Sequence, residues 1–226
     1  MAPAATNYPI AVLLAGVVGY VLYSQNSTAA GDGTIIDGIA FPGSHKLSGT
    51  TVQLAGGGTR IKYGVAKVYA VALYLDSRGA SGALQPFAGA KPPTKAAKFY
   101  QAIIDGGFTK TLHMQFHRSV SAEAMVEALN EAMNKRLAPD AVAKFASAVY
   151  KALPSSSIAK GDQLFFTCKA KTLSIGAGVP GARAALSEKG VCAALFDVFY
   201  GKSPVSPAAK EGAAVGFAKR FYLKQK

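Results

Sequence analysis

The clearest hydrophobic pattern runs from Val65 to Asp76, with the sequence VAKVYAVALYLD. This stretch is rich in β-branched and aromatic residues and contains no turn former. Its apolar residues are nearly continuous, which is typical of a strand with both faces covered. We therefore predict a central strand here, preceded by shorter strands in IIDGIAFPG and SGTTVQLAGGGTRIKYG.

Two later segments also have the character of strands. In TLHMQFHRSV, apolar residues alternate with His113, Gln115 and His117, which is the period of a half-buried strand. The face that carries these polar residues is expected to be exposed to solvent or to line a site. The segment QLFFTCKAKTLSI is predicted as one further strand, followed by a glycine-rich turn and a short edge segment.

Helical spacing occurs between and after these strands. PTKAAKFYQAIIDGG predicts a short helix that ends at its double glycine. Ser121 is a candidate N-cap for a helix through about Leu137, and residues 140–153 form its predicted antiparallel partner. A last helical region divides at Pro204. Strands, clustered helices and strands again predict an α+β domain whose antiparallel sheet is covered on one face by a layer of helices.

The amino-terminal segment has a different character. From Tyr8 to Tyr23 the chain carries 16 residues without a charge, somewhat fewer than the roughly 20 that a membrane-spanning helix needs. A signal peptide cleaved near Ala29 is the alternative, but its positively charged start is missing. We expect residues 1–30 to be a hydrophobic anchor or targeting segment plus linker, which associates the protein with a membrane, and residues 31–226 to be the folded domain.

Charge narrows the class of partner. The net charge is +13, and all 25 lysines and arginines lie after residue 45. Such a balance favours anionic partners, which include lipid headgroups, acidic ligands and nucleic acid. The basic residues form no block, so we interpret them as solvated helix faces and expect no nucleic-acid partner.

Cysteine and histidine usage indicates no cofactor. Cys168 and Cys192 lie 24 positions apart, with no second cysteine pair and no histidine at ligand spacing, so we expect two core thiols rather than a disulfide or a zinc site. A metal site or acid–base pair on His113 and His117 is the alternative to a solvated strand face, but no third or fourth ligand is visible. We predict no metal and no cofactor.

Three segments carry a family signature: GGGTRIKYGVAKVYAVALYLD, FHRSVSAEAM and FDVFYGKSPVSPAAK. Together they resemble the chalcone isomerase-like family, in its order and spacing, over about residues 34 to 218. The true isomerases of this family cyclise chalcones to flavanones, whereas related members bind fatty acids without catalysis. The resemblance implies the chalcone isomerase fold and allows a plastid compartment.

The same resemblance identifies candidate site residues. In the isomerases an arginine neutralises the developing oxyanion, and four polar side chains position water and substrate. Arg60 matches that arginine, and Tyr69 stands where the isomerases have a threonine and the fatty-acid binders a tyrosine. Apolar residues occupy the other three polar positions, namely Met125, Ala132 and Val198. The chain is therefore most similar to the non-catalytic, fatty-acid-binding members.

The residue types support this interpretation. Methionine, alanine and valine offer no hydrogen bond to a ketone, but they extend an apolar wall. Arg60 and Tyr69 suit a carboxylate, because one is a permanent cation and the other a phenol donor. Their separation of nine would place them on opposite faces of one unbroken strand, so Gly64 is expected to supply a bulge or tight turn between them.

We therefore expect a monomer that binds a fatty acid or similar apolar carboxylate in a buried pocket, with Arg60 and Tyr69 holding the carboxylate. One alternative is a divergent intramolecular lyase that uses Arg60 as oxyanion stabiliser but lacks polar partners. Another is an interaction module in which the amino-terminal anchor and basic charge hold the domain on an anionic membrane surface and the pocket is vestigial. Without the resemblance, Arg60 would be interpreted as a surface cation and Tyr69 as a core residue.

Overall fold

The computed structural model describes residues 33–47 and 49–223. The predicted anchor at residues 8–23, and the segment 1–30 as a whole, lie outside the described residues. Within the described ranges, no helix is long and apolar enough to cross a membrane.

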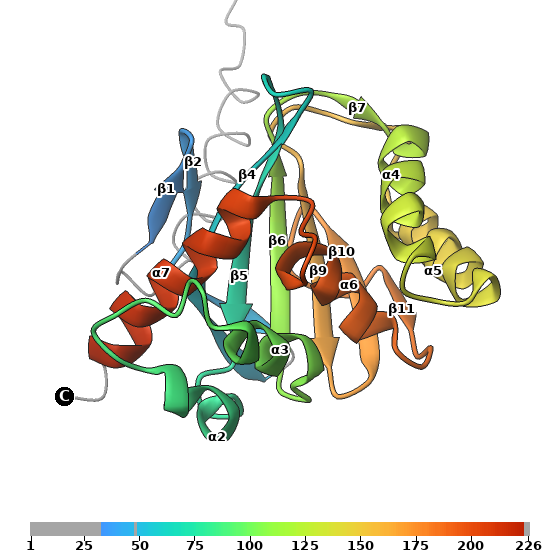
Figure 1. Cartoon of the computed structure of the whole chain (residues 1–226). Helices are drawn as coiled ribbons and strands as arrows, with labels where there is room; N and C mark the ends of the chain where they lie inside the picture. The colour runs from blue at the N-terminus through green and yellow to red at the C-terminus, as the bar shows by residue number, and fades with distance from the viewer. Residues whose placement is uncertain (1–32, 48, 224–226) are drawn as a thin grey trace, which may run out of the picture. The chain divides into compact units, whose positions relative to one another are not determined.

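A seven-stranded antiparallel sheet forms the centre of the fold (Figure 1). In spatial order its strands are β11 (Ala184–Leu186), β10 (Thr172–Ala177), β9 (Gln163–Lys169), β6 (Lys110–Phe116), β5 (Ala66–Leu75), β4 (Thr50–Lys62) and β3 (Ser44–Leu47). Two small antiparallel pairs accompany it, β1 (Thr34–Ile36) with β2 (Ile39–Phe41), and β7 (Val120–Ser121) with β8 (Ser157–Ile158). The α+β prediction is confirmed.

Strand β5 lies inside the sheet and is buried on both faces, as its continuous apolar sequence predicts. Tyr69, Val71 and Leu73 belong to the main core, which lies between the sheet and the helices. The alternate residues Ala70, Ala72 and Tyr74 belong to a smaller core that includes Phe41, Leu47, Val52 and Leu54. The strand is thus covered by helices on one side and by the amino-terminal strands on the other.

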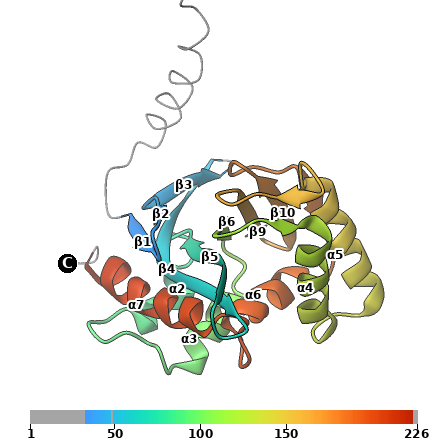
Figure 2. The same ribbon diagram turned by 90° about the horizontal axis from the view of Figure 1, so that it is seen from above.

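The helices follow the predicted spacing. They are α2 (Ser81–Leu84), a short 3₁₀ turn (Gln85–Phe87), α3 (Ala97–Asp105), α4 (Ala122–Asn134), α5 (Pro139–Ala152), α6 (Val191–Tyr200) and α7 (Pro207–Leu223). Ser121 caps α4 as predicted, because its Oγ accepts a hydrogen bond from the backbone N–H of Ala124 at 3.1 Å. Figure 2 shows α4 and α5 side by side, and α7 running along β4.

The segment predicted as one strand over QLFFTCKAKTLSI is instead the hairpin of β9 and β10. The chain reverses at Ala170, which adopts a left-handed conformation with φ +54°. Alanine takes this conformation rarely, and the reversal contains no glycine, asparagine or proline. The apolar alternation therefore continues through the turn, which is why the pattern did not indicate it.

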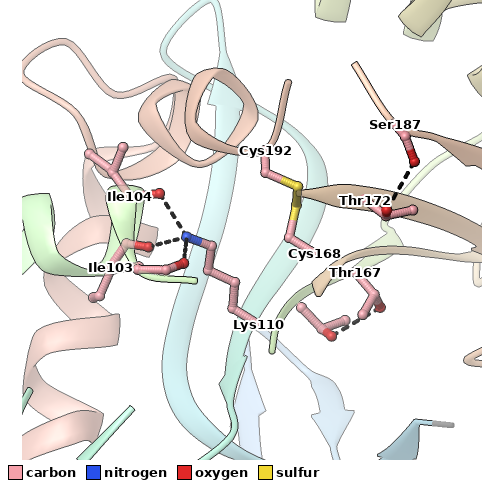
Figure 3. The surroundings of a disulfide bond; sticks show 10 residues. Ile103, Ile104, Lys110, Thr167, Cys168, Thr172, Ser187 and Cys192 are labelled. Atoms are coloured by element: carbon pink, nitrogen blue, oxygen red, sulfur yellow. Dashed lines mark hydrogen bonds between the residues drawn. A yellow bond between two sulfur atoms is a disulfide. The ribbon is translucent and has the colours of Figure 1, made fainter. Parts of the chain in front are cut away.

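The prediction of two core thiols is wrong, because Cys168 and Cys192 form a disulfide (Figure 3). Cys168 lies near the end of β9 and Cys192 in the first turn of α6, and their Cα atoms are 5.9 Å apart. The packing of α6 on the sheet brings the two residues together. Their spacing in the sequence carries no sign of that contact.

Figure 3 also shows Lys110, the single lysine that is buried in the described part of the chain. Its Nζ donates to the backbone carbonyls of Ile103, Ile104 and Gly106 at 2.5, 2.7 and 2.9 Å. These carbonyls lie at the C-terminal end of α3, where they lack partners within the helix. Burial lowers the pKa of Lys110 to about 8. Lys110 thus joins β6 to the end of α3.

Candidate functional site

Arg60 and Tyr69 lie directly opposite each other in the hairpin of β4 and β5. The chain turns at Tyr63 and Gly64, both of them left-handed with φ +55° and +75°. The expected break at Gly64 is therefore a tight turn. A register shift immediately after Arg60 leaves Val68 as an extra residue on β5. Because cross-strand partners project from the same face of a sheet, Arg60 and Tyr69 can serve one site.

The guanidinium of Arg60 is held by the connection between α6 and α7. Its Nη1 donates to the carbonyl of Val205 at 2.6 Å. Val205 is itself fixed, because its backbone N–H donates to the carbonyl of Val198 at 2.9 Å. The hydroxyl of Ser206 then donates to the carbonyl of Thr59, also at 2.9 Å. The stretch from Pro204 to Pro207, which belongs to the third family segment, thus orients Arg60.

Glycines allow α7 to lie directly on β4. A Cβ atom at Gly58 would overlap the backbone of Ala208, and one at Gly212 would overlap the carbonyl of Gly57. Any larger residue at these positions would push the helix away from the strand. This close approach is what brings the connection before α7 within hydrogen-bond distance of Arg60.

A cavity of about 250 Å³ opens beside Arg60 and Tyr69. Its walls come from the β4–β5 hairpin, the loop after β6, helix α4, and α6 with the connection that follows it. All five predicted site residues line it, namely Arg60, Tyr69, Met125, Ala132 and Val198. The residues that α4 contributes are all apolar: Ala124, Met125, Ala128, Leu129 and Ala132. The helix wall can therefore contact a ligand only through apolar groups.

The polar end of the cavity carries positive charge and a neutral donor. Burial raises the pKa of Tyr69 to about 12, although the nearby Arg60 opposes this effect. The phenol therefore stays protonated at neutral pH. Within the described ranges, Arg60 has no ion pair with an acidic side chain and Tyr69 makes no hydrogen bond. A cation without a counterion beside a free phenol donor suits an anionic group.

The sequence analysis missed Lys62 and Arg118, which line the same cavity and are exposed to solvent. Both follow from the register of the sheet. Tyr69 pairs with Phe116, so the loop after β6 lies beside the start of β5 and the hairpin turn. Figure 1 shows this loop and the hairpin at the same end of the sheet. Knowledge of the strand pairing would have identified Lys62 and Arg118. The periodicity of the sequence does not reveal which strands pair.

His113 does not lie on the wet strand face that the alternation predicted. It is 2% exposed, and its ring stacks on Phe165 with centroids 4.2 Å apart. Its Nε2 lies 2.9 Å from Oε1 of Gln163, and its Nδ1 lies 3.2 Å from Nε2 of His45. These two partners allow a neutral imidazole to be buried without loss of hydrogen bonds. Among the described residues, no group of three or more His, Cys, Asp or Glu is placed to hold a metal.

Comparison with known proteins identifies the fold and the family. The crystal structure of a fatty-acid binding protein of Arabidopsis thaliana matches it with a TM-score of 0.69 and 17% sequence identity, covering 85% of this chain and 100% of that chain. At this identity the likeness establishes the fold. No curated protein matches the sequence significantly. The family described as chalcone isomerase-like matches residues 33–212, most of the chain, in agreement with the segments that first indicated it. The protein is therefore a member of the chalcone isomerase-like family.

Proposed function

We propose that the protein binds a fatty acid, or a similar apolar carboxylate, in the cavity beside Arg60 and Tyr69 and does not transform it. The observation that carries the proposal is the position of an unpaired cation and a neutral phenol at the polar end of an apolar wall. The carboxylate would accept hydrogen bonds from both groups, and the chain would lie along α4. A solved neighbour that shares the fold is itself named a fatty-acid binding protein, which supports this class of ligand.

The size of the cavity limits the ligand. At about 250 Å³ it lies slightly below the roughly 300–1,000 Å³ of typical small-molecule pockets, so we expect it to take a single acyl chain rather than a two-chain lipid. Each methylene buried contributes about 0.8 kcal/mol, or roughly a fourfold change in affinity. Neighbouring chain lengths are therefore weakly distinguished.

Catalysis would need polar groups where the cavity has apolar ones. Met125, Ala132 and Val198 can neither orient a water nor bind a substrate ketone. Turnover of a chalcone above its spontaneous rate would support the intramolecular lyase in place of the binding protein. Membrane association through residues 8–23, a plastid compartment and a monomeric state belong to the same proposal.

Lipid extracted from the purified protein and identified by mass spectrometry tests the proposal directly. Titration with palmitic acid then tests the site. Arg60→Gln removes one charge-assisted contact of about 1.5–3 kcal/mol, so its dissociation constant should be about 10- to 150-fold higher than that of the wild type. Tyr69→Phe removes a neutral donor to the same carboxylate and should raise it about 10-fold or more. Arg78→Gln, which removes an exposed cation outside the cavity, should leave it unchanged.

A fatty alcohol of the same length provides the matched ligand. It has no carboxylate, so wild type and Arg60→Gln should bind it with similar affinity. Equal binding of palmitic acid by these two proteins would refute the assignment of Arg60. Failure of the wild type to bind any acyl ligand, together with no extractable lipid, would refute the proposal as a whole.

A further inference from the structure

The tip of the β4–β5 hairpin exposes apolar side chains to solvent. Tyr63 and Val65 are 83% and 84% exposed, and Ile61 is 48% exposed. Of the six large hydrophobic residues that are exposed in the described part of the chain, these three fall within five consecutive positions. We call residues 61–65 the hairpin tip. Figure 1 shows the hairpin projecting beyond the end of the sheet.

The turn at the hairpin tip places a bulky side chain in an unfavourable backbone conformation. Tyr63 adopts φ +55°, the left-handed conformation that asparagine, aspartate or glycine usually supplies in such a turn. A bulky residue in this conformation is a genuine outlier, and such outliers cluster at ligand clamps and other functional sites. Tyrosine combines an apolar ring with a polar end, and it is enriched where membrane meets water.

Positive charge surrounds the hairpin tip. Lys62 and Arg118 are exposed at the outer end of the cavity. Lys160 is also exposed and lies next to them, because its backbone N–H donates to the hydroxyl of Ser119, another cavity residue, at 3.2 Å. None of these three cations has an ion pair with an acidic side chain in the described ranges. Of the neighbouring acids, Asp37 is already paired with Lys67 at 3.0 Å, and the carboxylate of Asp162 accepts a hydrogen bond from the backbone N–H of Ala159 at 2.8 Å.

We propose that the hairpin tip docks on the surface of an anionic lipid bilayer. Ile61, Tyr63 and Val65 enter the interface, and the three cations lie among the headgroups. A nucleic acid would match the charge but would offer no apolar phase for isoleucine and valine. Lys62 and Tyr63 also line the cavity, so its entrance faces the bilayer when the tip docks. Exchange of an acyl chain at that entrance rests on the proposed function, whereas docking itself does not.

The sequence contains no tryptophan, so one introduced tryptophan is the only source of indole fluorescence and reports on its own surroundings. In the full chain, Tyr63→Trp places an indole at the hairpin tip, and Tyr150→Trp places one at a 48% exposed position on α5. With vesicles of phosphatidylcholine and phosphatidylglycerol, fluorescence of the Tyr63→Trp variant should shift to the blue and be quenched by brominated lipid. Fluorescence of the Tyr150→Trp variant should do neither. Equal responses, which would mean tethering without insertion, or no response at position 63, would overturn the proposal.

The charge requirement is tested in the Tyr63→Trp background. Lys62→Gln, Arg118→Gln and Lys160→Gln together should weaken insertion of the hairpin tip into the anionic vesicles about 100-fold, at roughly fivefold for each cation, seen as loss of the blue shift and of quenching. The matched control replaces three exposed cations away from the tip by glutamine, namely Lys169, Lys171 and Lys189. It should leave insertion intact, and equal losses in the two sets would overturn the proposal. Insertion that persists in Arg60→Gln, with fatty-acid binding lost, separates docking from the proposed function.

Discussion

The buried histidine pair makes the stability of the fold depend on pH. Burial lowers the pKa of His113 to about 3 and that of His45 to about 4, from an ordinary value of 6.5. Both rings stay neutral in the folded protein, whereas the unfolded chain protonates them as the pH falls through 6.5. The free energy of unfolding is therefore fully retained above about pH 6.5 and decreases between that pH and about pH 4.

The size of the decrease follows from the pKa differences. At pH 5 each histidine is about 1.5 pH units below its unfolded pKa, which corresponds to about 2 kcal/mol. Together the two histidines should lower the free energy of unfolding by about 3 to 4 kcal/mol. The lower end of this range allows for His45, which is partly exposed, so that water screens its charge. This is a large part of the roughly 5–15 kcal/mol that stabilises a typical domain. Below pH 6 the slope should approach 2 to 3 kcal/mol per pH unit.

Urea denaturation followed by circular dichroism, at intervals between about pH 7.5 and pH 5, measures this slope. His113→Phe keeps an aromatic ring stacked on Phe165 but removes one titrating group, so it should roughly halve the slope whatever its effect on stability at pH 7.5. His117→Gln, which changes the remaining histidine, should preserve most of it. A free energy of unfolding that stays constant from pH 7.5 to pH 5, or an unchanged slope in His113→Phe, would refute the reasoning.

Three further changes test the packing. Reduction of the disulfide between Cys168 and Cys192, which closes a loop over a separation of 24 residues, should lower the free energy of unfolding by about 3.5 kcal/mol in urea titrations, and an equal midpoint with and without reductant would contradict this. Gly58→Ala should cost about 3 kcal/mol or more by thermal melting because its Cβ overlaps the backbone of α7, whereas Gly82→Ala meets open space and should cost nothing. Lys110→Met removes the donor to three carbonyls and should lower the melting temperature by about 6 to 12 °C, and an unchanged value would show that water replaces the ammonium.

Local patterns were sufficient where one segment determines its own structure. The continuous apolar run of β5 and the cap at Ser121 needed no knowledge of the rest of the chain. The candidate pair Arg60 and Tyr69 came from a family resemblance, and the hairpin turn at Gly64 explains how residues nine positions apart reach one face. These are cases in which local preference and tertiary structure agree.

The errors all involve contacts between distant segments or turns without turn formers. Ala170 reverses the chain without any residue that signals a turn. Cys168 and Cys192 meet only after α6 packs on the sheet. The alternation predicted a solvent-facing His113, because a buried neutral imidazole occupies the same alternate positions as an exposed polar residue. In the fold, the ring has Gln163 and His45 as its hydrogen-bond partners. Periodicity reports which face a side chain occupies, but not what covers that face.

The hydrogen bond from Arg60 to Val205 joins residues 145 positions apart, with a consequence for biosynthesis. A ribosome that adds about 5–20 residues per second would need roughly 7 to 30 s between these two codons. During this interval the nascent chain has its guanidinium but not the carbonyl that orients it. The finished cavity can therefore form only after residue 205 has emerged, and a chain truncated before it would carry an arginine without its support.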